Sequence, residues 1–402
     1  MTVGSCVFDV GVGLGDRLRK STKRRRTPLW ARLCAAFGAV LLIVSGGTLV
    51  TGQTLIAKYT SGITDESLLD DGAAQAAEKK TEIKGPLTLL LVGIDPRKPE
   101  TPPLSDSILI AHIPADMSTA YLFSMPRDLY VDIPADSKSG VRAHSGKINS
   151  AMALGSQVNG KIDVTNGFKL LSKTVRNYTG IEQFDAAAII NFGGFKDMVE
   201  ALGGVSMVID MDVKSEHLTP EGKQRPRKAS CPVTSSCDHP YTGPQAYYKK
   251  STKPVRLQPW QALDYVRQRY PNAGVPMSDY DRQRHQQQFI KAMAKEAMSS
   301  GVVTDVGKMT KILDAAGKSL TFAGGGNSPI EWALALKDVN VDDMVTIKLP
   351  GGGKFQNPSN NTGYLGEEFR PASTADDFFK AVKEDRVAQF LIDNPGIVNM
   401  DS

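Results

Sequence analysis

The sequence predicts an α/β fold in which helices cover both faces of a central mixed sheet, a three-layer α/β/α arrangement preceded by one transmembrane helix. Several apolar runs are short and lack helical periodicity, which is typical of strands that are buried on both faces. These runs occupy residues 87–94, 108–113, 120–123, 184–192 and 205–211. Segments with helical periodicity alternate with them, and such alternation favours helices packed on a sheet.

The helical segments are indicated by their spacing and by residues suited to helix ends. Helices are expected at 167–178, 195–202, 302–320, 329–336 and 375–391, with a last strand at 344–349. Gly203 and Gly204 are placed to end the second of these helices. Pro259 is suited to begin another helix, and Ser278 or Asp279 to cap the one that follows.

Composition and charge limit the classes of protein. The chain has 402 residues, of which 41% are hydrophobic and 23% are charged, the balance of a globular protein. Its net charge is +5, and residues 1–28 alone carry seven basic and two acidic residues, which is also +5. Because the remainder has no net charge, no strongly basic surface is indicated and we expect no nucleic-acid partner.

The N-terminal region predicts attachment to a membrane. After the basic tail at 1–28, residues 33–50 form a run of 18 residues without charge. With its flanks, at 29–51, this run is long enough to cross a bilayer, and the positive-inside rule places the tail in the cytoplasm. A cleaved signal peptide is the alternative, but no clear A-x-A site follows. We therefore expect a single-pass cell-membrane protein whose bulk is extracellular.

The remaining chain divides by composition. Residues 52–84 are polar and are expected to form an extracellular linker or stalk, followed by a catalytic domain at 85–350. Residues 351–402 are too few for a separate module, so we expect this extension to pack on the same domain. Cys231 and Cys237 share a loop that would be extracellular, where a disulfide is expected. A zinc site with His217 and His239 is the alternative, although its spacing is irregular.

Acidic residues gather at the ends of the first predicted strands. Asp95 follows the run at 87–94, which is where ligands bind in open α/β sheets. Asp106 precedes its strand, so an antiparallel neighbour would bring it beside Asp95. Two adjacent carboxylates repel unless a cation lies between them, and Mg²⁺ or Mn²⁺ takes such ligands together with phosphate oxygens. Alternatively, both are ordinary turn residues.

Arginines collect near the same sheet end and at two helix ends. Arg267 and Arg269 lie at the end of the helix begun by Pro259, and Arg282 shares a face with Gln286 in the first turns of the next helix. A helix N-terminus favours anions, and guanidinium groups bind phosphates with two hydrogen bonds. The cluster favours a phosphate or pyrophosphate ligand, whereas the alternative is a solvated charged face.

The motifs resemble those of the LytR-CpsA-Psr family of cell-envelope glycopolymer transferases. The similar segments, in the family's order within about 86–298, are VGIDPR, SDSILIAHI, SMPRDLYVDIP, KINSAM, NFGGFKDMVEALGGV, QALDYVRQR and DYDRQRHQQQFI. The resemblance implies transfer of a glycopolymer, with its proximal phosphate, from a polyprenyl-pyrophosphate carrier onto a hydroxyl of peptidoglycan. It also implies an apolar tunnel for the lipid, for which the candidate lining residues are Phe168, Leu171, Phe192, Phe195, Met198 and Val199. Taken singly, each of them is expected to be an ordinary core residue instead.

Carried onto this sequence, the resemblance implies a role for each motif residue. Asp95 and Asp106 would hold Mg²⁺, Asp106 and Arg127 would act in catalysis, and the pyrophosphate would be bound by Arg97, Arg127, Arg267, Arg269, Arg282 and Gln286. Asp106 is the first candidate to accept the proton of the sugar hydroxyl, with Asp128 as the alternative. Lys147 and Asn149 would also line the site, unless Asn149 caps a helix that starts at Ser150.

Two positions depart from the family's pattern, and two other functions remain open. Leu104 and His285 stand where family members often have arginine. His285 would make activity depend on pH if it lines the site, but we expect it to point into solvent. A pyrophosphatase acting on the same lipid carrier would use the same site with water. A non-catalytic glycopolymer-binding anchor would not need carboxylates paired with arginines, and a transcriptional regulator is disfavoured because the domain would lie outside the cell.

Overall fold

A computed structural model describes residues 65–69, 82–96, 98, 100–232, 237, 239–269 and 278–399. The described residues all belong to one compact unit, Leu55–Ser402. The basic tail and the predicted transmembrane helix therefore lie outside the described residues, as does most of the stalk. Within the described ranges, no helix is both long and apolar enough to span a bilayer.

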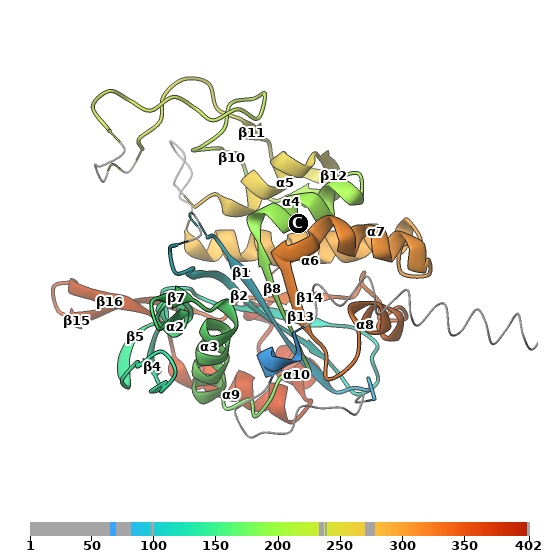
Figure 1. The fold of residues 1–402 in the computed structure, drawn as a ribbon, viewed down its shortest axis with the longest axis horizontal. Coiled ribbons are helices and arrows are strands. Elements are labelled where there is room, and N and C mark those ends of the chain that lie inside the picture. Colours follow the sequence, from blue (N-terminus) through green and yellow to red (C-terminus); the bar gives the residue numbers. More distant parts are fainter. Residues whose placement is uncertain are drawn as a thin grey trace, which may run out of the picture. The chain divides into compact units, whose positions relative to one another are not determined.

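A mixed six-stranded sheet forms the centre of this unit (Figure 1). Its order is β13 (Leu320–Ala323), β8 (Ala186–Asn191), β1 (Leu87–Ile94), β2 (Ser105–Ile113), β3 (Tyr121–Met125) and β14 (Val345–Ile347). The pairs β1 with β8 and β3 with β14 are parallel, and the other neighbours are antiparallel. The predicted α/β fold with a mixed central sheet is confirmed.

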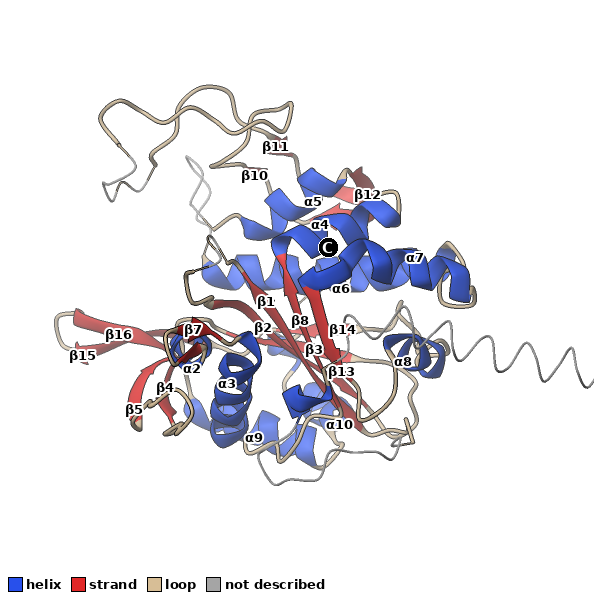
Figure 2. Cartoon of the chain, in the orientation of Figure 1, coloured by secondary structure: helices blue, strands red, loops and turns tan. Residues whose placement is uncertain are grey.

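Helices pack on the sheet or on one another (Figure 2). They are α2 (Ile148–Gly155), α3 (Val164–Thr179), α4 (Phe192–Ala201), α5 (Pro259–Arg267), α6 (Asp279–Ser299), α7 (Val306–Ala316), α8 (Pro329–Ala335), α9 (Ala372–Lys383) and α10 (Val387–Asp393). The 3₁₀ turns of the described residues are η1 (Glu66–Leu69), η2 (Gly317–Ser319) and η3 (Pro395–Ile397).

The strand pairs outside the sheet are β4 (Tyr130–Ile133) with β5 (His144–Lys147), β6 (Gln157–Val158) with β7 (Lys161–Ile162), β9 (Val205–Ile209) with β12 (Ser251–Leu257), β10 (Val213–Lys214) with β11 (Tyr247–Tyr248), and β15 (Gly351–Asn357) with β16 (Thr362–Phe369).

Alternate residues of each central strand enter different cores, as the pleat of a strand requires. Leu90 and Ile110 pack in one core with side chains from α2, α3 and α9. Leu87 and Leu109 face the opposite side, where they pack with Trp332 of α8. Both faces of the sheet are therefore covered, which explains why these strands read as continuous apolar runs.

The C-terminal residues complete the first of these cores. Phe378 and Phe379 of α9 are almost fully buried, and both rings contact Phe123 of β3. The single helix predicted at 375–391 is wrong, because the chain breaks at Asp385, whose φ is 53°, and continues as α10. The β15–β16 hairpin was not predicted, since its glycine-rich first strand carries little apolar periodicity.

Two other expectations need correction. The helix predicted at 302–320 is confined to α7, and Leu320 instead begins the edge strand β13. Asn149 does not cap a helix, because α2 already begins at Ile148 and Asn149 is buried within it. By contrast, Pro259 is the first residue of α5, and the side chain of Ser278 caps α6 together with Asp281, as expected from the sequence.

Candidate functional site

A polar pocket of about 130 Å³ lies where β1 and β2 approach the ends of α5 and α6. Seven residues that the sequence placed in the site line it: Asp95, Asp106, Arg127, Arg267, Arg269, Arg282 and Gln286. Gly93, Ser107, Phe192 and His217 complete the lining among the described residues. Arg97 lies outside the described residues, so its predicted role stays a prediction.

A β-bulge brings the two predicted metal-binding carboxylates into one pocket. Asp95 directly follows β1, as the sequence indicated. Asp106 does not precede its strand, which corrects the prediction. Gly93 pairs with Ser107 and Ile94 with Ser105, so Asp106 is the extra residue in β2. A bulge of this kind redirects a side chain, and here the carboxylate of Asp106 faces the pocket.

Arg127, two residues after β3, binds the carboxylate of Asp106. Its Nη1 donates a hydrogen bond to Asp106 Oδ1, while its Nε lies 3.9 Å from Asp128 Oδ1. Asp128 also lies 3.5 Å from Lys147 Nζ. Neither Asp128 nor Lys147 lines the pocket, and Asn149 is buried in α2. The three additional candidates, Asp128, Lys147 and Asn149, thus lie near Arg127 but do not line the pocket.

The end of α5 supplies two more guanidinium groups. Arg267, the last residue of the helix, donates from Nη2 to Asp95 Oδ2 at 3.5 Å. Its guanidinium carbon lies 4.0 Å from the centre of the Phe192 ring, a distance suited to a cation–π contact. Arg269 reaches the same pocket two residues later.

The first turns of α6 bring Arg282 and Gln286 against β2 at the pocket. Arg282 is only 5% exposed, pairs with Asp279 at 2.7 Å, and donates from Nη2 to the backbone oxygen of Asp106 at 3.1 Å. Burial lowers the pKa of Arg282, and the charge of Asp279 partly offsets this effect. Gln286 accepts a hydrogen bond from Ser107 Oγ at 2.8 Å, which joins α6 to β2.

Positive charge exceeds negative charge in the pocket. Four arginines and two carboxylates line it, and the α6 N-terminus adds its dipole. Arg127 Nε and Arg282 Nε are buried donors with no hydrogen-bond partner in the described part of the chain. Four guanidinium groups lining one pocket fit an anionic ligand with several acceptor oxygens.

The donor set also fits a hard divalent cation. Asp95 and Asp106 offer two carboxylates, the number with which Mg²⁺ commonly binds when substrate phosphates and water complete its shell. Among the described residues, no group of three or more His, Cys, Asp or Glu side chains could hold a metal unaided. A cation at this pocket would therefore need oxygens from a phosphate ligand.

The other face of α6 is anchored on Asp210, just after β9. Arg284 and His285 lie 2.5 and 3.1 Å from its two carboxylate oxygens, and Gln288 donates to it at 3.0 Å. Burial alone would raise the pKa of Asp210, but the hydrogen bonds from His285 and Arg284 outweigh it and hold the pKa well below its usual range.

The predicted exposure of His285 is wrong. Its side chain is fully buried and stacks on Tyr265 with ring centres 4.4 Å apart, so it faces Asp210 rather than solvent or the pocket. Leu104, the other departure from the family pattern, is 40% exposed and does not line the pocket. Neither position therefore contributes a side chain to the pocket lining.

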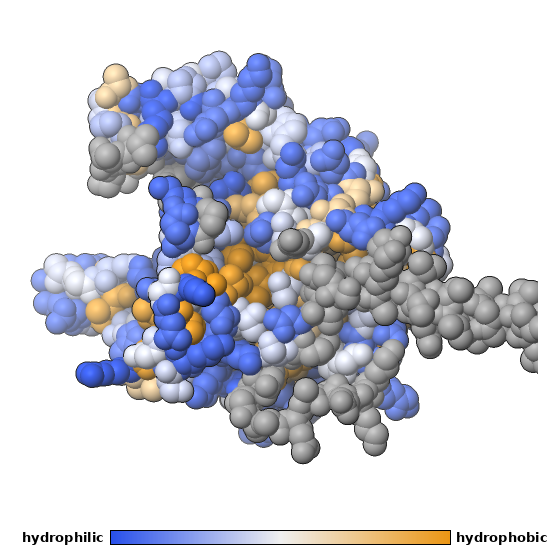
Figure 3. Space-filling view, viewed as in Figure 1, coloured by the Kyte–Doolittle hydropathy of each residue, from blue (hydrophilic) through white to orange (hydrophobic). Residues whose placement is uncertain are grey.

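Two apolar cavities continue from the polar pocket. The first, of about 230 Å³, shares Phe192, Arg267 and Gln286 with the pocket. The second, of about 370 Å³, shares Phe195 and Met198 with the first and extends to α7 and α8. Apolar side chains gather around this region on the face shown in Figure 3.

These cavities separate the predicted tunnel residues into two groups. Phe192, Phe195 and Met198 line them, whereas Phe168 and Leu171 are fully buried in the core beneath α3. Val199 is likewise fully buried, in a core with β9 and α5. Helical spacing alone could not distinguish these positions, because both groups are apolar and regularly spaced.

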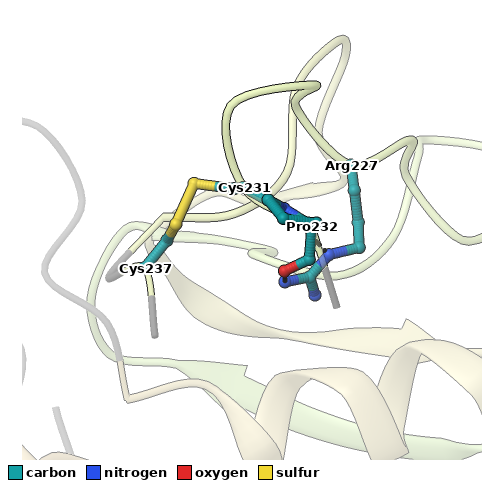
Figure 4. The surroundings of a disulfide bond; sticks show 4 residues. All are labelled: Arg227, Cys231, Pro232 and Cys237. Atoms are coloured by element: carbon teal, nitrogen blue, oxygen red, sulfur yellow. Dashed lines mark hydrogen bonds between the residues drawn. A yellow bond between two sulfur atoms is a disulfide. The ribbon is translucent and has the colours of Figure 1, made fainter. Parts of the chain in front are cut away.

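His217 is a pocket residue that sequence reasoning did not place there. The sequence suggests His217 only as a ligand of the alternative zinc site, because nothing near it in the sequence links it to Asp95 or Arg127. In the structure Cys231 and Cys237 form a disulfide with a Cα–Cα distance of 6.1 Å (Figure 4). His239 instead contacts Glu216, with Nδ1 3.2 Å from Oε2.

Comparison with known proteins identifies relatives over most of the chain. The LytR_cpsA_psr family model matches residues 55–375. The polyisoprenyl-teichoic acid–peptidoglycan teichoic acid transferase TagU of Bacillus cereus is 25% identical over 314 residues, covering 78% of this chain and 85% of TagU. The cell wall biosynthesis protein LcpA of Corynebacterium glutamicum is 24% identical over 333 residues, covering 76% of this chain and 57% of LcpA.

A solved structure shares the fold. The crystal structure of Bacillus subtilis TagV superposes with a TM-score of 0.52 at 22% identity, covering 76% of this chain and 98% of TagV. The match extends over nearly the whole of TagV, so the sheet and its covering helices belong to a known architecture.

Proposed function

The chain belongs to the LytR_cpsA_psr family, and from this membership we propose that it moves a glycopolymer from a polyprenyl-pyrophosphate carrier onto a hydroxyl of peptidoglycan. One observation carries the proposal: an arginine-rich pocket adjoins an apolar cavity, which in turn adjoins a second apolar cavity. A ligand that fits both must join a strongly anionic group to a long apolar chain. A polyprenyl pyrophosphate has this chemistry.

The chemistry of transfer requires no covalent enzyme intermediate. The acceptor hydroxyl oxygen forms a bond to the phosphorus that carries the glycopolymer, and the bond from that phosphorus to the bridging oxygen breaks. Polyprenyl phosphate leaves with the bridging oxygen, and the hydroxyl proton passes to a base. The charge that builds on the phosphoryl oxygens and the leaving phosphate is what a site must stabilise.

The pocket residues divide this task by position. Arg127 and Arg282 line the pocket beside Asp106, and Arg267 and Arg269 approach from α5. We assign these four guanidinium groups, with Gln286, to the two phosphates of the donor. Arg97 is assigned with them from its place in the motif. Fixed donors of this kind stabilise charge without rearranging during the reaction.

Asp95 and Asp106 are assigned to a divalent cation, Mg²⁺ or Mn²⁺. When bound, such an ion would neutralise charge on the phosphoryl oxygens. Arg127 donates to Asp106, so this arginine both holds the metal-binding carboxylate and faces the phosphate. The catalytic assignment of Asp106 and Arg127 follows from this shared position.

The cavities receive the lipid in this proposal. Phe192 lies at the junction, where its ring contacts Arg267 and also lines the first apolar cavity. Burying apolar lipid surface contributes about 25 cal/mol per Å², so even a few isoprene units would add substantially to donor affinity. We place the predicted transmembrane helix at 29–51 as the anchor that holds the domain outside the cell, next to the membrane that contains the donor.

Two alternative functions differ in how they would use the site. A pyrophosphatase acting on the same carrier would need the same arginines and carboxylates, with water in place of the acceptor. A non-catalytic glycopolymer anchor would not need Asp106 paired with Arg127 beside three further arginines. The transferase is the function that the pocket, the apolar cavities and the family support together.

The test is transfer of a radiolabelled saccharide from polyprenyl pyrophosphate onto peptidoglycan by the full-length protein, with Mg²⁺ or with EDTA. Asp106→Ala and Arg127→Ala should each abolish transfer, as should EDTA. Asp338→Ala is a matched control, because this carboxylate is 84% exposed and pairs only with neighbouring Lys337 in the described structure. Release of label as soluble sugar phosphate alone would identify a pyrophosphatase, and binding without turnover would identify an anchor.

A further inference from the structure

An arm formed by residues 213–248, from β10 to β11, leaves the domain beyond β9 and returns to it at β12 (Figure 1). His217 lies near the base of this arm and lines the polar pocket together with Asp95, Asp106 and the arginines. Its role is not explained by phosphate binding, which the arginines already supply. A role for His217 in the reaction rests on the proposed transfer function.

A buried polar network fixes the arm to α5, the helix that carries Arg267. Ser215 Oγ donates to Asp264 Oδ1 at 3.0 Å, and the backbone N–H groups of His217 and Leu218 donate to Ser215 Oγ at 3.1 and 2.8 Å. The N–H of Glu216 donates to the side chain of Gln268 at 2.9 Å. Ser215, Glu216, Asp264 and Gln268 are all at least 95% buried.

This network determines the position of His217 relative to the arginines. Gln268 lies between Arg267 and Arg269 in sequence, so the hydrogen bond to Glu216 ties the arm backbone to the pocket wall. Polar groups buried in this way are stable only when their partners are in place, which makes the arrangement rigid. The imidazole is therefore held at the pocket by the backbone on either side of it.

A second set of contacts supports the ring itself. The ring of Tyr241 packs edge-on against His217 with centres 5.7 Å apart, and Arg227 lies over Tyr241 at 5.4 Å. Arg227 also donates to the backbone oxygens of Cys231 and Pro232, at 3.0 and 3.1 Å (Figure 4). Cys231, Arg227 and Tyr241 thus form a chain of contacts that ends at the His217 ring.

Most other groups in the pocket are poorly suited to accept a proton. The arginines are permanently protonated donors. Asp106 accepts from Arg127 and Asp95 from Arg267, and both carboxylates are assigned to the metal. Ser107 donates to Gln286. Asp128, the alternative base in the sequence analysis, does not line the pocket.

We propose that His217 is the base that accepts the proton of the attacking peptidoglycan hydroxyl. The hydroxyl oxygen bonds to phosphorus as its proton passes to the imidazole, and polyprenyl phosphate leaves with the electrons of the broken phosphorus–oxygen bond. Histidine titrates near neutral pH, which suits a general base. The charged or titratable groups around it are Asp95, Asp106, Arg127, Arg267, Arg269 and Arg282 from the pocket, and Glu216, Arg225, Arg227, His239 and Tyr241 from the arm.

The test compares His217→Gln and His217→Ala with His144→Gln, an exposed histidine on β5 as the matched control. Transfer and donor binding are measured separately in the full-length protein, with polyprenyl-pyrophosphate disaccharide and Mg²⁺. We expect both His217 variants to bind the donor as the wild type does, while kcat falls about 100- to 10,000-fold. Imidazole added to His217→Ala should restore part of the rate, and the control should be unaffected.

The pH profile supplies a readout that a structural role would not change. Wild-type kcat should fall as pH decreases through the usual range of a histidine, and His217→Gln should lack this decrease. The assignment would be overturned if His217→Gln had the same kcat as the wild type. It would also be overturned if the variant lost donor binding to the same extent as activity. A wild-type protein that binds the donor but never transfers it would instead refute the proposed function, which separates the two failures.

Discussion

Replacement of Asp210 by Asn should destabilise the protein without touching the pocket. The carboxylate of Asp210 is 7% exposed and accepts hydrogen bonds from Arg284, His285 and Gln288, all on one face of α6. The opposite face of the same turns carries Arg282 and Gln286 into the pocket. An Asn side chain at position 210 has nearly the same volume as Asp but no charge. Its NH₂ group would also face Arg284, His285 or Gln288, which themselves donate hydrogen bonds at this position.

The expected loss follows from the burial of this ion pair. Removal of one partner from a buried pair costs about 3–5 kcal/mol, because the other charge is left without compensation. Arg284 is 19% exposed and keeps a second ion pair with Asp281 at 2.7 Å, so the lower end of that range applies. We expect the free energy of unfolding to fall by about 3 kcal/mol at pH 7.

The pH dependence has a definite sign. Although burial raises it, the net pKa of Asp210 is lowered in the folded state by His285 and Arg284. Its contribution is therefore complete above the unfolded-state pKa of about 3.9 and decreases as the pH falls below that value. The difference between wild type and Asp210→Asn should be constant between about pH 5 and 7 and should shrink below about pH 4.

Urea unfolding followed by tryptophan fluorescence measures this difference at each pH. Asp338→Asn is the control, because its side chain is 84% exposed and should change little. Equal unfolding free energies for Asp210→Asn and wild type at pH 7 would refute the reasoning. A difference that stays the same from pH 7 to pH 3 would show that the lost interaction is not electrostatic.

Three further predictions concern the pocket, the cavities and the arm. Arg282→Lys should weaken donor binding about 10- to 100-fold in calorimetry, because an ammonium group replaces a buried guanidinium that can donate two hydrogen bonds to charged oxygens. Unchanged affinity would contradict the assignment of Arg282 to the donor phosphates. Met198→Trp should narrow both apolar cavities, which Met198 lines, and raise KM for long-chain donors but not for short-chain ones, whereas equal effects on both would place the lipid elsewhere. Joint replacement of Cys231 and Cys237 by Ser should expose the arm to trypsin and lower the free energy of unfolding. The chain-entropy model gives only about 2 kcal/mol for so short a loop, and an unchanged digestion pattern would show that the bond does not hold the arm.

Local pattern determined much of the secondary structure. The bounds of β1 agree with the predicted apolar run, since both of its faces are covered and every residue is apolar or small. Pro259 and Ser278 marked the starts of α5 and α6, because helix termini depend on nearby side chains that satisfy the free N–H groups. The ordered motifs also placed Asp95, Asp106 and the arginines in one site, and all the described ones line one pocket.

Tertiary structure decided the properties that depend on distant neighbours. The bulge that redirects Asp106 arises from the register between β1 and β2, and the burial of His285 depends on Asp210 after β9. The same is true of the division between tunnel and core, where Met198 faces a cavity but Val199 does not. The periodicity of the sequence does not distinguish Met198 from Val199. Other segments of the chain determine whether the space next to each side chain is filled or open.

His217 shows this limit most clearly. Its neighbours in sequence give no indication of the pocket, and more than a hundred residues separate it from Asp95 and Asp106. It reaches the site only because Ser215 and Glu216 are hydrogen-bonded to Asp264 and Gln268 of another segment. The sequence by itself determined the strands, helix ends and charged motifs, whose causes are local. Packing and hydrogen bonding between distant segments determined which side chains meet, because these contacts exist only in the folded chain.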